Sequence, residues 1–192
     1  ELSVHGAEYA KDVYRAPGWV GHHNTDVWRR ASPNSGPLCG MWPTGGAWLC
    51  MHIWQHWLHT LDKEFLAKHY ETMKGAADFF LSQMVRNPGT GKLTVCPSSS
   101  PEHGPKGGSA LQPGCAMDHQ IVRDLLNATA DAATALGKDR QYAAELRKCA
   151  GEIEPDHIGK WGQLQEWTLD MDDPQDRHRH FSHLYAVYPS AQ

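Results

Sequence analysis

The sequence lacks the features that most quickly assign a chain to a class of protein. No apolar run approaches the roughly 18 residues that a membrane-spanning helix needs. The formal net charge is -4, and lysine and arginine form no basic tract. No glycine-rich phosphate loop and no nucleophile elbow occurs. We therefore expect no membrane span and no nucleic-acid partner.

Cysteine is sparse and shows no pairing pattern. The five cysteines are odd in number and dispersed, and no two form a Cys-x-x-Cys pair. Such spacing fits neither a zinc ribbon nor a small disulfide scaffold. We expect buried thiols, and one disulfide stays open if the protein is exported. The first residues lack the charged-then-apolar order of a signal peptide, so the compartment stays undecided.

The chain begins at Glu1, without an initiator methionine, in what reads as the middle of a helix. Its 192 residues are 40% hydrophobic and 21% charged, which is ordinary for one globular domain or for a piece of a larger one. We expect residues 1–192 to be a fragment of a single domain with no internal boundary.

Tryptophan and histidine, in contrast, are abundant, with 8 Trp and 13 His. Aromatic faces pack against sugar C–H surfaces and imidazoles hydrogen-bond to hydroxyls, so this composition favours a sugar cleft, although Trp-rich cores also exist. Residues 18–45 carry several of these side chains and show no sustained period. A loop of this length is usually functional or disordered, and disordered segments are poor in aromatics. We therefore expect this loop to be functional.

Apolar residues recur at helical spacing elsewhere in the chain. The ranges in which we expect helices are 4–14, 46–61, 63–86, 117–136 and 139–150, with a helical turn at 183–188. Trp48, Trp54 and Trp57 predict a heavily aromatic buried face on the second of these helices. Short and long connections alternate between these helices, and strand patterns are almost absent. This arrangement predicts an all-α helical toroid, with its cleft at the end of the toroid where the long loops lie.

A single carboxylate, Glu102, lies in a loop framed by Pro97 and Pro101. Glycosidic bond cleavage needs a carboxylic acid to protonate the departing oxygen and a second group to activate water or attack carbon. A free Glu has a pKa of about 4.3, and enclosure away from cations raises it. The serines of this loop are neutral neighbours, so we expect such an enclosure. A lone Glu, however, is more often a surface residue in a turn.

A second constellation, between residues 166 and 183, mixes acidic residues with Arg and His. His178, His180 and His183 have a spacing that resembles a set of metal ligands, which would make a metal-dependent hydrolase. The interleaved arginines place positive charge beside such a cation. Alternating Arg and His suit hydrogen bonds to hydroxyls and carboxylates better. We expect no metal ion here.

Several groups of residues, taken together and in order, carry a family resemblance. They are Gly18-Trp19-Val20 with His22-His23-Asn24-Thr25-Asp26, Trp42-Pro43 with Gly45-Gly46-Ala47-Trp48-Leu49, Cys96 to Glu102, Met117-Asp118 with Gln120-Ile121, and Gln163 to Trp167 leading to His178-Arg179-His180 and Ser182-His183-Leu184-Tyr185. This set closely resembles glycoside hydrolase family 95. The resemblance implies part of an (α/α)6 barrel catalytic domain and inverting hydrolysis of terminal α-1,2-linked L-fucose, with α-L-galactosidase activity in some relatives.

The resemblance also implies roles for individual residues. The general acid is the Glu of the Ser-Pro-Glu motif, here Glu102. Arg179 and His180 match the family's sugar-contacting pair, and Trp42 matches its pocket tryptophan. Asp26 stands near an acidic position of the family, and we expect His23 beside it to bind substrate as well. The expected partner is a fucosylated glycan, with no cofactor, and the oligomeric state stays open.

In this family the attacking water is activated by a pair of Asn residues assisted by an Asp. We expect the Asn-x-Asn segment before residue 1 and the Asp after residue 192, so the isolated chain would be inactive. Extracellular glycans as substrates favour a secreted or periplasmic protein. Two alternatives stay open: a non-catalytic or degenerate sugar-binding protein, and the histidine-based metal hydrolase.

Overall fold

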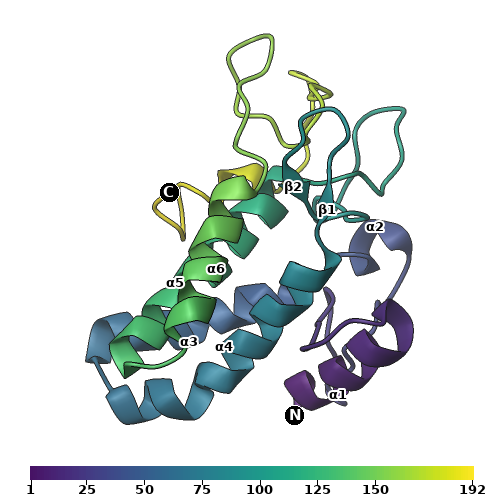
Figure 1. Cartoon of the computed structure of the whole chain (residues 1–192). Helices are drawn as coiled ribbons and strands as arrows, with labels where there is room; N and C mark the ends of the chain where they lie inside the picture. The colour runs from purple at the N-terminus through teal and green to yellow at the C-terminus, as the bar shows by residue number, and fades with distance from the viewer.

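The computed structural model describes residues 1–192, and helices joined by long loops dominate it (Figure 1). The elements are α1 (Leu2–Tyr9), a π-helical turn (Ala10–Tyr14), α2 (Pro37–Gly40), α3 (Gly45–Thr60), α4 (Lys63–Gln83), β1 (Val85–Arg86), β2 (Leu93–Thr94), α5 (Ala116–Leu136), α6 (Arg140–Glu152) and a 3-10 turn (Ser182–Leu184). The predicted all-α class is confirmed, and these elements do not close into a barrel. None of the helices has the length and apolarity needed to cross a bilayer.

Helix α5 lies at the centre of the helical core, where it packs against α3, α4 and α6. The large apolar side chains buried between these helices are Leu66, Tyr70, Met73, Phe79, Phe80, Ile121, Val122, Leu125, Leu126 and Leu146. Burial of each such side chain stabilises the fold by roughly 1.5–3 kcal/mol. The apolar period predicted for α4 and α5 is therefore the period of their buried faces.

The start of α4 and the end of α5 follow the local chemistry of the sequence. Asp62 caps α4 by accepting a hydrogen bond from the Phe65 N–H at 2.9 Å. Gly137 ends α5 in the left-handed conformation, with φ of 71°. Two predicted ends are wrong. Helix α4 stops at Gln83 because β1 leaves it to pair with β2, and Gly151 lies inside α6 instead of ending it.

The aromatic face of α3 differs from the prediction. The buried residues of this helix are Gly46, Ala47 and Cys50, whereas its tryptophans are only half-buried. Trp48 and Trp54 line a groove between α3, α5 and the C-terminal residues. The helices that pack against α3 cover its small residues, so the tryptophan face stays partly open.

Trp19 fixes the start of the long 18–45 segment against the helices. Its indole Nε1 donates to the Thr72 carbonyl at 2.7 Å, and its ring lies against the backbone of α3 and α4. A Cβ added at Gly46 would come within 2.8 Å of this ring, and one at Gly75 within 2.9 Å. Glycine at both positions therefore permits the close approach that places the following residues, 20–25.

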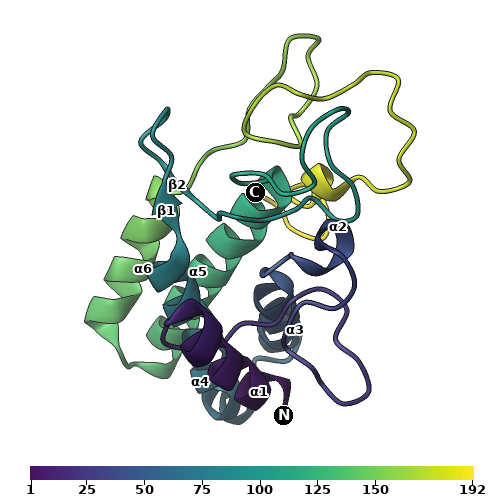
Figure 2. The same cartoon turned by 90° about the vertical axis from the view of Figure 1, so that its right-hand side faces the viewer.

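Two long loop segments, the connection between β2 and α5 and much of the chain after α6, gather at one end of the helical core (Figures 1 and 2). Isolated β-bridges order these segments: Ser98 pairs with Gln112 within the connection between β2 and α5, and Cys115, just before α5, pairs with Trp167. The first bridge closes one loop on itself, and the second ties the later segment to the start of α5. The loop end is therefore an ordered surface, as the toroid prediction requires.

Candidate active site

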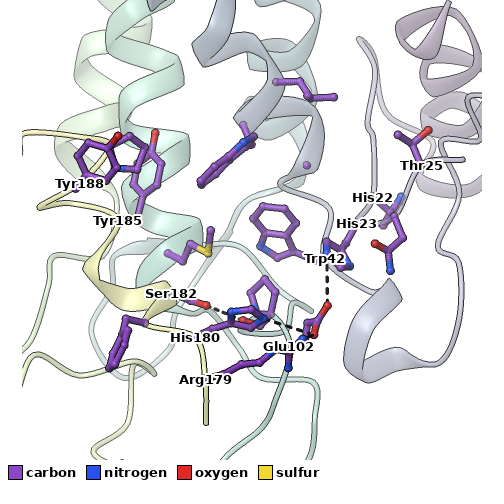
Figure 3. Close-up of a pocket in the computed structure, with 18 of the residues that line it drawn as sticks. His22, His23, Thr25, Trp42, Glu102, Arg179, His180, Ser182, Tyr185 and Tyr188 are labelled. Atoms are coloured by element: carbon purple, nitrogen blue, oxygen red, sulfur yellow. Dashed lines mark hydrogen bonds and ion pairs between the residues drawn. The ribbon is translucent and has the colours of Figure 1, made fainter.

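A cavity of about 580 Å³ lies between the start of α3, residues 22–25, the loop around Glu102 and residues 179–189 (Figure 3). This volume is within the range of pockets that hold small ligands. Aromatic and apolar side chains form much of its wall, among them Trp42, Trp48 and Tyr185. Glu102 is the only carboxylate among the lining residues.

Three side chains from two other segments converge on Glu102 (Figure 3). Arg179 Nη2 donates to Glu102 Oε2, and His180 Nε2 lies 3.5 Å from the same oxygen. On the other side, His23 Nε2 lies 4.0 Å from Glu102 Oε1. The Glu102 side chain is 25% exposed, so it can meet a ligand in the cavity. The structure thus brings together four of the six predicted site residues.

The expectation that Glu102 lies away from cations is wrong. The hydrogen bond from Arg179 lowers the pKa of Glu102, and the opposing effect of desolvation is smaller. The local run of serines is neutral, as expected, but Arg179 enters from 77 residues further along the chain. In the site as it stands, the carboxyl group is held in its ionised form.

Trp42 lines the cavity in a fixed position and is the fifth predicted residue that lies there. It is buried, and its indole Nε1 donates to Asp118 Oδ1 at 2.7 Å. Thr44 Oγ1 donates to the same carboxylate oxygen at 2.7 Å. Burial raises the pKa of Asp118 to about 6. Asp118 was part of the Met117-Asp118 motif, but its support of Trp42 was not predicted from the sequence.

The two adjacent histidines of the 18–45 segment differ in role. His23 Nδ1 donates to the Cys39 carbonyl at 2.8 Å, which leaves Nε2 directed at Glu102. His22 Nδ1 donates to the Ala31 carbonyl, and its Nε2 accepts from the Tyr14 hydroxyl at 2.7 Å. Burial lowers the pKa of His22 to about 4. His22 is therefore a neutral structural residue, whereas His23 can exchange hydrogen bonds with a ligand.

Asp26 lies outside the cavity. Its Oδ1 accepts from the backbone N–H groups of Trp28 and Arg30, at 3.0 and 3.1 Å. Its Oδ2 lies 3.6 Å from Arg30 Nε. The carboxylate thus closes a turn in its own loop, and the structure does not bring it together with Glu102.

The three histidines considered as metal ligands face three different partners. His180 faces Glu102, His178 stacks on His103 with ring centroids 3.9 Å apart, and His183 Nδ1 lies 3.6 Å from Glu166 Oε2. Nowhere do three His, Cys, Asp or Glu side chains converge as a metal site requires. The geometry therefore offers no metal site built on these histidines.

Residues 181–189 form a cavity wall that sequence reasoning did not identify. Phe181, Ser182, Tyr185 and Tyr188 line this wall. Ser182 Oγ donates to the Pro101 carbonyl at 2.6 Å, which joins the wall to the loop of Glu102. Their position directly after Arg179 and His180 could have indicated that they line the same site. The apolar helical pattern of these residues alone does not indicate a binding surface.

The fold and the cavity together define a class of protein. A helical core carries an aromatic pocket of ligand size, and one carboxylate, one arginine and two histidines meet at its wall. Aromatic faces with a few convergent polar groups are typical of carbohydrate sites. The class is that of an all-α carbohydrate-active domain.

More specifically, the chain belongs to glycosyl hydrolase family 95, whose catalytic-domain profile matches residues 1–192. Alpha-L-fucosidase 2 of Arabidopsis thaliana is 36% identical over 195 residues, which cover 98% of this chain and 23% of that protein. Probable alpha-fucosidase A of Aspergillus niger is 35% identical over 193 residues, which cover 96% of this chain and 24% of that protein. The predicted family is confirmed, and the chain spans about a quarter of the length of these relatives.

Proposed function

We propose that the protein to which this chain belongs removes terminal α-1,2-linked L-fucose from glycans with inversion, and that Glu102 is its general acid. The observation that carries the proposal is the position of Glu102 as the only carboxylate lining the cavity of a family 95 chain. The names of the relatives, both alpha-fucosidases, support fucose as the sugar. Residues 1–192 would then be one part of a single catalytic domain.

An inverting reaction needs a second group on the opposite face of the sugar. Acid and base are usually roughly 6.5–9.5 Å apart, which leaves room for the attacking water. Since Glu102 has no carboxylate partner in the cavity, this chain supplies the acid half of the mechanism. The water-activating groups would come from residues outside these 192.

The ion pair with Arg179 fits this mechanism if substrate binding changes it. An ionised Glu102 cannot donate a proton. Arg179 is 67% exposed and can turn toward sugar hydroxyls, which would weaken its hydrogen bond to Glu102. The pKa of Glu102 would then rise, and the carboxyl group would take up the proton that the glycosidic oxygen receives.

The proposed sugar contacts are Trp42, His23, Arg179 and His180. Trp42 is held by Asp118 and offers an apolar surface to the sugar ring, while the other three supply hydrogen bonds to hydroxyls. Asp26 is not part of this set, because its carboxylate binds its own loop. Neither a cofactor nor a metal ion has a part in this scheme.

The test is a Glu102→Gln variant of a full-length protein that contains this chain. On a 2-fucosylated oligosaccharide we expect kcat to fall by about 100- to 10,000-fold, the usual contribution of general acid catalysis, with substrate binding retained. The matched control is Glu152→Gln. Glu152 also pairs with an arginine, Arg86, which lowers its pKa, but it lies at the end of α6 outside the cavity. Unchanged turnover in Glu102→Gln would contradict the assignment of Glu102 as the general acid.

Two further measurements address the stereochemistry and the linkage. Proton NMR at early reaction times should show β-L-fucose as the first product, and α-L-fucose first would contradict inversion. Oligosaccharides with α-1,3- and α-1,4-linked fucose, and a terminal L-galactose analogue, should be poorer substrates than the α-1,2-linked one. A full-length protein that binds fucosylated glycans without cleaving them would instead support the hypothesis of a non-catalytic sugar-binding protein. The single carboxylate in the cavity also fits that hypothesis.

A further inference from the structure

One buried carboxylate, Glu166, joins the two segments that form the acid site. Its side chain is 7% exposed and lies beneath the cavity without lining it. We propose that Glu166 is a positioning residue, which holds the loop of Glu102 in register with the segment of Arg179 and His180. This inference rests on the proposed function, in which Glu102 donates the proton.

The contacts of Glu166 lie on both sides of Glu102 in the sequence. Glu166 Oε1 accepts from the Ser100 hydroxyl, two residues before Glu102. Glu166 Oε2 lies 3.5 Å from Nε2 of His103, the residue that follows Glu102. The short stretch that carries the acid is therefore attached to Glu166 at both of its ends.

The same carboxylate reaches the opposite segment. Glu166 Oε2 lies 3.6 Å from Nδ1 of His183, three residues after His180. His183 belongs to the 3-10 turn of Ser182–Leu184, whose Ser182 also binds the Pro101 carbonyl. Glu166 is thus the side chain that contacts both the loop of the acid and the segment of its two partners.

Glu166 is itself anchored on the helical core. Its carbonyl accepts from the N–H of Ala116, the first residue of α5, at 2.9 Å. Its N–H donates to Asp172 Oδ1 at 3.1 Å, and the next residue, Trp167, is buried and bridged to Cys115. The anchor matters because a catalytic group keeps its geometry only when its support is rigid. Through Glu166, the loop of Glu102 is held at a fixed position relative to α5.

The carboxyl group of Glu166 makes this attachment through both of its oxygens. A buried carboxyl group needs polar partners, and here the Ser100 hydroxyl donates to Oε1, while imidazole nitrogens of His103 and His183 lie 3.5 and 3.6 Å from Oε2. One of these imidazoles, on His103, also lies 3.3 Å from Asp176 Oδ2 and stacks on His178. A Gln at position 166 can still accept from Ser100, but an NH2 group replaces Oε2, the oxygen that faces both histidines.

The test compares Glu166→Gln with Glu154→Gln in the full-length protein. Glu154 is a matched control, since it is also buried, accepts from the Thr90 hydroxyl and lies 2.9 Å from His157 Nε2, but it does not line the cavity. Each variant is assayed on a 2-fucosylated oligosaccharide, which needs a proton from the enzyme. Each is also assayed on α-L-fucosyl fluoride, whose leaving group departs without one.

We expect Glu166→Gln to lose about 100-fold in kcat on the oligosaccharide, the scale set by a small misplacement of a catalytic group. Its loss on the fluoride should be much smaller, and KM should change little. Glu154→Gln should retain activity on both substrates. An equal loss on both substrates, or no loss on either, would overturn the positioning role. Ser100→Ala is a milder variant that should show the same selectivity should Glu166→Gln fail to fold.

Glu102→Gln, assayed in parallel, separates the two proposals. It should lose activity on the oligosaccharide and retain it on the fluoride. If it does and Glu166→Gln does not, the positioning role alone is wrong. If Glu102→Gln shows no such selectivity, the assignment of the general acid is wrong.

Discussion

At the scale of single residues, the pKa of Glu102 depends chiefly on one neighbour, Arg179, with a smaller effect of His180. The Arg179 guanidinium lowers the pKa of this carboxyl, whereas desolvation alone would raise it. Removing Arg179 leaves the desolvation, so the pKa of Glu102 should rise. A general acid works only in its protonated form, and a higher pKa keeps that form present to higher pH.

We therefore predict that Arg179→Gln moves the alkaline limb of the kcat/KM profile of the full-length protein to higher pH. The absolute rate should fall as well, because Arg179 is a proposed sugar contact. The measurement is kcat/KM on a 2-fucosylated oligosaccharide across the pH range. Arg86→Gln is the control, since Arg86 pairs with Glu152 outside the cavity and its loss should leave the profile in place. A limb that moves to lower pH in Arg179→Gln would contradict the prediction.

Much of the site was predictable because its residues fall in short motifs that keep their order. Five of the six predicted residues line one cavity, and Asp26 does not. What the sequence could not show is which of these side chains touch. The Arg179–Glu102 pair spans 77 residues and the Ser100–Glu166 bond spans 66, so both arise from tertiary packing.

At the scale of elements, the helices were predictable where local chemistry decides them. The Asp62 cap and the Gly137 stop are local signals, and the structure follows both. The end of α4 was missed because the pairing of Val85 with Thr94 overrides helix propensity. The partial exposure of the α3 tryptophans was missed because periodicity shows which residues share a face and not what covers that face.

Gly18 gives a test of element packing. Its φ is 71°, and a Cβ there would lie 1.9 Å from the Gly75 carbonyl oxygen of α4. The left-handed conformation alone costs a non-glycine residue roughly 1–2 kcal/mol, and the contact with backbone adds to this. We predict that Gly18→Ala destabilises the protein by more than about 2 kcal/mol.

The control for Gly18→Ala is Gly137→Ala. Gly137 has the same φ of 71°, but a Cβ there would meet no atom within 4 Å. Its replacement should therefore carry the conformational cost alone. The measurement is the free energy of unfolding in urea for both variants of the full-length protein. Equal destabilisation by the two substitutions would show that the approach of residue 18 to α4 does not matter.

At the scale of the whole molecule, the chain holds an ordered cavity and, under the proposed mechanism, only one of the two groups that inversion needs. The cavity contains a single carboxylate, and the chain spans about a quarter of the length of its relatives. The half-buried tryptophan face of α3 also leaves a groove beside the C-terminal residues, lined by Trp48 and Trp54. Apolar surface of this kind favours association in solution.

We predict that the isolated 192-residue chain releases no fucose from a 2-fucosylated oligosaccharide, whereas a full-length protein containing it does. The physical reason is that, in the proposed mechanism, Glu102 protonates the leaving oxygen, but no second carboxylate lines this cavity to help activate the opposing water. Released fucose is measured at matched protein concentration, with the Glu102→Gln form of the isolated chain as a control for contaminating enzyme. Release that exceeds this control would mean that the water-activating group lies within these residues, and the division of the mechanism proposed above would be wrong.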